Sequence, residues 1–83
     1  MDKNAMGGIG MELFEISYNR LWKLLIDRRM KKKDLQKHTG LSSAVIAKMG
    51  RNETVHLETL AKICCALECT LAEIVDIRIC QPE

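Results

Sequence analysis

A chain of 83 residues with 47% hydrophobic residues and a net charge of +2 has room for one domain, which would bury about 60–65% of its unfolded surface. No apolar run approaches the roughly 20 residues that cross a bilayer, and the N-terminus lacks a secretory signal pattern, so we expect a cytoplasmic protein without a membrane partner. The chain also lacks a Ser/His/Asp set, a paired-carboxylate motif and a glycine-rich phosphate loop, so neither catalysis nor a cofactor is expected.

The charge is unevenly distributed along the chain. Residues 17–52 carry ten Lys or Arg and two acids, a net +8, whereas residues 1–16 carry −2 and residues 53–83 carry −4. A segment this polarised has an electrostatic field of its own, and a polyanion is the partner that suits it.

The N-terminal part of the chain changes character at about residue 11. Residues 1–10 are polar, contain glycine without any periodicity, and are predicted to form a disordered extension. Residues 11–83 then form the single domain. They open with an alternating stretch, which predicts a short strand with Phe14, Ile16 and Tyr18 on one face.

A helical pattern of apolar residues begins at Asn19 and ends near Arg29. Trp22 in this helix could serve as a stacking platform for nucleic-acid bases. A single Trp inside an amphipathic helix more commonly packs against a core, and packing is the interpretation that we prefer.

Two short helices joined by a tight turn are predicted over Lys32–His38 and Ser43–Met49. Gly40 supplies the turn, and Ser42 is a natural N-cap because its hydroxyl can accept from an unpaired backbone N–H of the next turn. The inward side of the second helix carries Val45, Ile46 and Met49. Its outward side carries only Ser43, Ala44, Ala47 and Lys48. This outward side has little bulk, so the helix backbone could closely approach a large surface.

Three consecutive lysines, Lys31, Lys32 and Lys33, stand at the start of the first of these two helices. Cations there oppose the helix macrodipole at about 0.3–1 kcal/mol each, and Asp34 offsets only part of that cost. A DNA phosphate seated at the helix start would turn the repulsion into attraction. A solvated basic turn is the alternative that the residues leave open.

The C-terminal third continues with a polar loop and a helix predicted over Leu57–Leu67. Thr70 and Glu73 have the spacing of a capping box, which predicts a fifth helix over 71–75. Residues 75–80 alternate between apolar and polar side chains and predict a second short strand.

The stretch from Met30 to Asn52 resembles the helix-turn-helix of Cro/C1 (Xre) type transcriptional regulators, and the likeness extends over residues 21–75. The residues that carry the resemblance are Leu35, Gly40, Leu41, Ser42 and Ile46. The resemblance implies an all-α, five-helix, phage-repressor-like fold, to which the two chain ends can add a small two-stranded β-ribbon.

This sequence departs from the family pattern at three positions. Asn52 and Glu68 stand where the family usually has glycine. Asn tolerates a left-handed conformation, whereas Glu68 is expected to be mildly strained there. Gly50 replaces a common Glu, which is expected to shorten the helix or free its end and so to let Arg51 swing toward a phosphate.

The resemblance implies sequence-specific binding of double-stranded DNA, with the helix over 42–49 in the major groove, and a regulator that represses transcription. The base contacts that it implies are Ser43, Ala44, Ala47 and Lys48. The phosphate contacts are Lys31, Lys32, Lys33, Lys37, Ser42, Arg51 and Asn52. A face so short of hydrogen-bonding groups predicts modest direct readout, with affinity resting on phosphates and on DNA shape.

The two predicted strands suggest a homodimer. An isolated two-stranded ribbon is marginal in water, and pairing with the same edge of a second chain would bury apolar faces and open edges together. The residues predicted for this dimer interface are Phe14, Ile16, Ile77 and Ile79.

Four cysteines, at positions 64, 65, 69 and 80, raise the question of a metal or redox site. Their spacing lacks the second matching pair of a zinc site, so no metal is expected and buried thiols are preferred. His38 and His56 are interpreted as ordinary surface or loop residues. Two other functions stay open: a protein-interaction module such as an antitoxin, and a thiol- or metal-responsive regulator.

Overall fold

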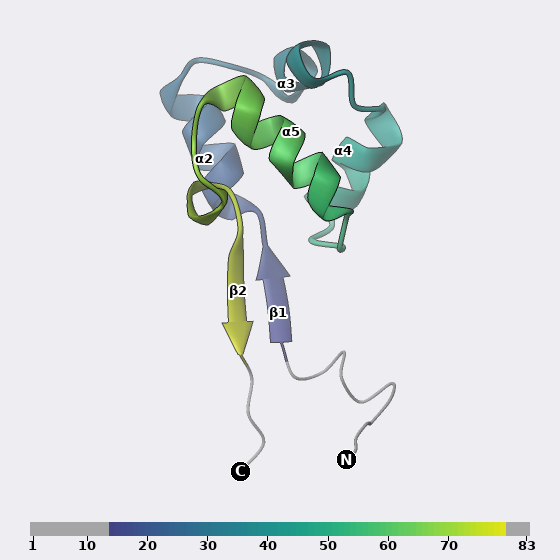
Figure 1. The fold of residues 1–83 in the computed structure, drawn as a ribbon, viewed down its shortest axis with the longest axis vertical. Helices are drawn as coiled ribbons and strands as arrows, with labels where there is room; N and C mark the ends of the chain where they lie inside the picture. Colours follow the sequence, from purple (N-terminus) through teal and green to yellow (C-terminus); the bar gives the residue numbers. More distant parts are fainter. Residues whose placement is uncertain (1–13, 80–83) are drawn as a thin grey trace.

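Four α-helices, one 3₁₀ turn and a two-stranded sheet make up residues 14–79, which are the residues that the computed structural model describes (Figure 1). In chain order the elements are β1 (Phe14–Ser17), α2 (Asn19–Asp27), α3 (Lys32–Thr39), α4 (Ser43–Gly50), α5 (Leu57–Leu67), η2 (Leu71–Glu73) and β2 (Asp76–Ile79). The extension predicted at 1–10 and Cys80 lie outside the described residues. None of the helices within 14–79 combines the length and the apolar character that a membrane crossing needs.

The two ends of the described chain pair as an antiparallel ribbon that projects away from the helices (Figure 1). Phe14 lies opposite Ile79 and Ile16 opposite Ile77. Because side chains alternate along a strand, these four apolar residues share one face. The predicted ribbon is therefore confirmed, and the fold is mostly helical with a small sheet rather than all-α.

The core lies between the four helices and is built from their periodic apolar positions. The buried side chains are Tyr18, Leu21, Leu25, Leu35, Leu41, Ile46, Met49, Leu60, Ile63, Leu67 and Ile74. No polar or charged side chain of residues 14–79 is buried. Trp22 is half-buried and packs against this core, which confirms the packing interpretation.

The ends of the helices follow local chemistry. Ser42 caps α4, with its Oγ accepting from the Val45 N–H at 3.2 Å. Gly40 takes the left-handed conformation after α3, at a φ of +74°. Glu68 takes it after α5 at +53°, where the Cβ of an L-residue crowds the backbone, so the strain expected at this position is confirmed.

The fifth helix was predicted wrongly. Thr70 and Glu73 do interact as the capping pattern requires, with the Thr70 N–H donating to Glu73 Oε1 at 2.9 Å. The result is only the three-residue turn η2, because Ile74 enters the core and residues from Asp76 onward are drawn into β2. Five residues cannot repay the cost of nucleating an α-helix without further turns.

Candidate nucleic-acid interface

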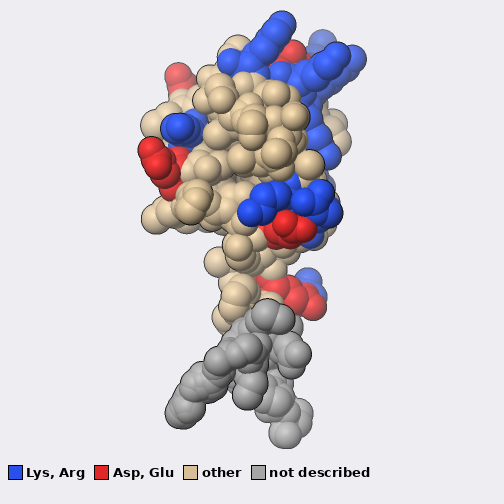
Figure 2. All heavy atoms as spheres, turned by 90° about the vertical axis from the view of Figure 1, so that its right-hand side faces the viewer, with Lys and Arg blue, Asp and Glu red and all other residues tan. Residues whose placement is uncertain are grey.

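The outer face of α4 is exposed on the surface of the fold. Ile46 and Met49 anchor the helix in the core, and the four residues predicted to contact bases are all exposed: Ser43, Ala44, Ala47 and Lys48. Figure 2 shows the side of the molecule on which α4 lies, where Lys and Arg gather in separate groups around a surface without charge. The arrangement offers a slim helix flanked by cations.

The start of α3 supplies one group of these cations. Lys31 and Lys33 are exposed there, and Lys37 is exposed in the last turn of the same helix. The Lys31 N–H donates to Asp34 Oδ2 at 2.8 Å, so the chain itself satisfies one of the unpaired N–H groups at this helix start. Asp34 therefore reduces the repulsion among the lysines without removing their positive field.

Lys32 is held in place by an aromatic ring. Its Nζ lies 4.3 Å from the centroid of the Trp22 ring, a cation–π contact worth about 0.5–1 kcal/mol at an exposed site. The same Nζ lies 3.8 Å from the point where a Cβ on Gly50 would stand. The start of α3 and the end of α4 thus meet beside Trp22. Sequence reasoning missed this role of Trp22, because the contact partner is ten positions away.

The loop after α4 is fastened to the start of α2. Asn52 has a φ of +58°, as its sequence position predicts, and its Oδ1 accepts from the Tyr18 N–H at 3.2 Å. The Tyr18 hydroxyl donates to the Glu53 carbonyl oxygen at 2.8 Å. Tyr18 is 1% exposed, and this burial raises the pKa of its phenol. The loop is therefore positioned by a core residue from another part of the chain.

Arg51 does not swing free at the end of α4. Contrary to the expected shortening, α4 runs through Gly50, and the Arg51 Nε donates to Glu53 Oε2 at 2.7 Å. This hydrogen bond is the main cause that raises the pKa of Arg51 and lowers the pKa of Glu53. No sequence pattern singled out Glu53, because the partner of its carboxylate depends on the conformation of the loop.

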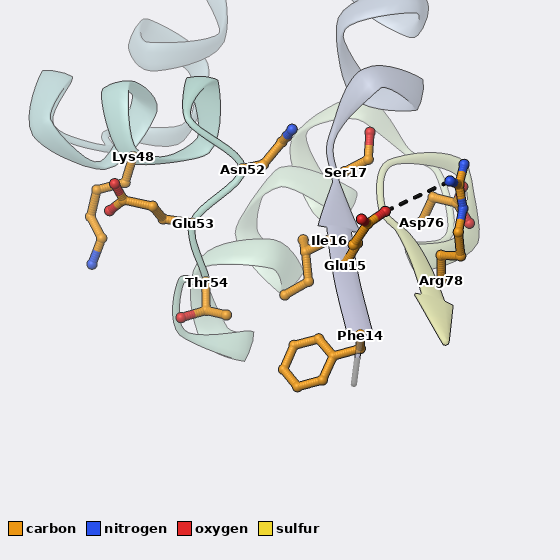
Figure 3. Close-up of a pocket in the computed structure, with 10 residues that line it drawn as sticks. All are labelled: Phe14, Glu15, Ile16, Ser17, Lys48, Asn52, Glu53, Thr54, Asp76 and Arg78. Atoms are coloured by element: carbon orange, nitrogen blue, oxygen red, sulfur yellow. Dashed lines mark ion pairs between the residues drawn. The ribbon is translucent and has the colours of Figure 1, made fainter. Parts of the chain in front are cut away.

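An open groove of about 730 Å³ runs between the ribbon and the loop after α4 (Figure 3). Phe14 and Ile16 of β1 lie on one side, and Lys48, Glu53 and Thr54 lie on the other. Beyond β1, Arg78 and Glu15 form an ion pair at 3.6 Å across the ribbon. The groove places the apolar side chains of β1 close to the end of the helix that carries the predicted base contacts.

The residues predicted to form a dimer interface lie on one face of the ribbon. Phe14, Ile77 and Ile79 are 40%, 57% and 62% exposed, while Ile16 packs partly against the core. The structure brings the four side chains together and leaves more than half of the surface of Ile77 and Ile79 uncovered. Their role in dimerisation stays a prediction.

The three cysteines within the described residues are free thiols. Cys64 and Cys69 are half-buried against the core, whereas Cys65 is exposed. Burial is the main cause that raises the pKa of the Cys69 thiol, and the neighbouring Cys64 raises it further. Across residues 14–79, no three His, Cys, Asp or Glu side chains converge as a metal site would require.

Comparison with known proteins gives two matches. Residues 20–78 match the family model described as a Cro/C1-type HTH DNA-binding domain. The chain is also similar to the crystal structure of the transcriptional regulator VanUg, at 40% sequence identity and a TM-score of 0.80, over 94% of this chain and 99% of that one. No curated protein matches the sequence.

Proposed function

Because this chain belongs to the Cro/C1-type helix-turn-helix DNA-binding family, we propose that it is a transcriptional regulator that recognises a specific sequence of double-stranded DNA. The observation that carries the proposal is the exposed, small-residued face of α4 with cations on either side of it. Its family is a DNA-binding one and VanUg is a regulator, which favours this function over an enzymatic one.

In the proposed complex α4 lies in the major groove. Lys48 donates to guanine O6 and N7, and Ser43 bonds a base edge or a phosphate. Ala44 and Ala47 contact thymine methyl groups, and their small size lets the helix backbone sit deep in the groove. Only two of these four side chains can form hydrogen bonds, so direct readout is modest and DNA shape contributes to recognition.

The phosphate contacts come from both ends of the helix-turn-helix and from its turn. The proposed donors are Lys31, Lys32, Lys33, Lys37, Ser42, Arg51 and Asn52. Asn52 already uses its Oδ1 to accept from Tyr18, so its side-chain NH₂ is the group that would donate to a phosphate. Trp22 supports this set by holding the ammonium of Lys32 beside the end of α4.

The proposed regulator acts as a homodimer that represses transcription. The apolar face of the ribbon joins two copies, and their α4 helices then reach two half-sites about 34 Å apart along the duplex. A protein seated across two successive major grooves excludes other proteins from the same DNA, which is the simplest route to repression.

Selection of bound sequences from a random DNA pool tests the function directly, since the spacing and symmetry of enriched sites report operator and dimer together.

Ala44→Glu should leave the fold intact and abolish binding, because it places a carboxylate against the DNA from an exposed position. Ala61→Glu, the same change at an exposed position on α5, is the matched control and should still bind. If folded Ala44→Glu binds DNA normally, α4 does not lie in the major groove.

The salt dependence is a second test. If each subunit of a dimer neutralises about four phosphates, log K should fall with log salt at a slope near −7, using about −0.9 per phosphate. A slope near zero would reject binding that depends on phosphates.

A further inference from the structure

An acidic side chain stands among the cations at the end of α4. Glu53 Oε2 lies 2.7 Å from Arg51 Nε, and Glu53 also lies beside Lys48 (Figure 3). The hydrogen bond from Arg51 lowers the pKa of Glu53, and the charges of Arg51 and Lys48 act in the same direction. Two cations that the proposed complex directs at DNA therefore have a protein anion as their neighbour before any DNA arrives.

The position of Glu53 is fixed through its backbone. Its N–H donates to the Lys48 carbonyl oxygen at 3.0 Å, and its own carbonyl accepts from the Tyr18 hydroxyl at 2.8 Å. Tyr18 is a core residue, 1% exposed, so the loop cannot move away without disturbing the core. The side chain of Glu53, which is 45% exposed, can give up its partner without any movement of the backbone.

We propose that Glu53 is an internal competitor for DNA phosphate, which occupies Arg51 and thereby limits how tightly this chain binds DNA of any sequence. The inference rests on the proposed function. The carboxylate occupies the Nε–H of Arg51, and its negative charge opposes a phosphate that approaches the other guanidinium N–H groups. A phosphate that uses the Nε–H as well must displace the carboxylate, which then faces the polyanion. Binding to non-specific DNA depends almost wholly on phosphate contacts, so it is the binding that such a competitor restrains most directly.

The test is the affinity of the full chain for a random-sequence duplex as a function of salt, for wild type and Glu53→Gln. Glu53→Gln should bind more tightly, and each Arg51 that gains a phosphate should steepen the slope of log K against log salt by about 0.9. The advantage of the variant should then shrink about 3.5-fold between 50 and 200 mM salt for one such Arg51, and about twelvefold for the two Arg51 of a dimer. Asp27→Asn is the matched control, since it removes the same charge from the end of α2, beside Arg20 and Lys23.

The same comparison in a chain that already carries Arg51→Gln separates competition for Arg51 from a general change in charge. In that chain, Glu53→Gln should no longer steepen the slope of log K against log salt. Equal slopes for wild type and Glu53→Gln, weaker binding by Glu53→Gln, or the same steepening without Arg51 would each overturn the role of Glu53. Failure of wild type and Glu53→Gln alike to bind any duplex would overturn the proposed function together with this inference.

Discussion

The hydroxyl of Tyr18 offers a sharp test of how the loop after α4 is held. Tyr18→Phe removes one oxygen atom from a side chain that is 1% exposed and leaves the ring in the core. The atom lost is the donor to the Glu53 carbonyl, 35 positions away in the chain. The change therefore isolates one long-range hydrogen bond.

The expected loss of stability is modest but measurable. A hydrogen bond of this kind contributes about 0.5–1.5 kcal/mol net, and a carbonyl left buried without a donor costs about 1–3 kcal/mol. Glu53 is an exposed residue whose carbonyl can gain water, so the lower range applies and we expect about 1 kcal/mol. For a domain of this size that loss lowers the Tm by roughly 4–8 °C.

The pH dependence supplies an internal control. Burial raises the pKa of Tyr18 above its ordinary value of 10, so the neutral phenol stabilises the fold fully below pH 10, and this stability is lost as the pH rises through the folded-state pKa. Wild type should lose this stability above pH 10, while Tyr18→Phe should not. Urea unfolding at pH 7 and above pH 10 measures both, and the gap between the two proteins should narrow at high pH. Equal stability at pH 7, or a gap independent of pH, would refute the reasoning.

Two further predictions use other features of the fold. Glycine should have opposite effects on the free energy of unfolding at two left-handed positions. Glu68→Gly should stabilise the fold by about 1 kcal/mol by relieving strain. Asn52→Gly should destabilise it by about 1 kcal/mol because the Tyr18 N–H loses its acceptor. Urea unfolding of both variants checks the signs, and stabilisation by both would show that the Asn52 hydrogen bond contributes nothing. At micromolar concentration, Ile77→Asp should sediment as a monomer, while wild type and Arg78→Ala, on the opposite face of the ribbon, should sediment as dimers. A monomeric wild type would contradict the proposed dimer interface.

The features that could be predicted from the sequence are those set by short-range chemistry. The cap at Ser42, the left-handed turn at Asn52 and the spacing of the inward residues on α4 each depend on neighbours within one helical turn. The terminal ribbon is an exception, because its alternation is local while its pairing joins the two ends of the chain.

The features that could not be predicted depend on contacts between distant segments or on competition between elements. The sequence pattern places Trp22 among core residues, and only the path of the folded chain brings Lys32 over its ring. Arg29 has a φ of +58° that no local signal indicated. The capping interaction between Thr70 and Glu73 was predicted correctly. The capping pattern could not indicate that the residues after it pack into the core or join β2.

The helix proposed to read DNA depends on residues that never touch it. An isolated helix of eight residues is unstable in water, and the outer face of α4 cannot be packed against the fold if it is to enter a groove. Its order must then come from the buried Ile46 and Met49, from the Ser42 cap and from the loop tied to Tyr18. Mutations at Tyr18 should therefore weaken DNA binding through the placement of α4 even though Tyr18 lies in the core, and the loss in affinity should grow with the loss in stability.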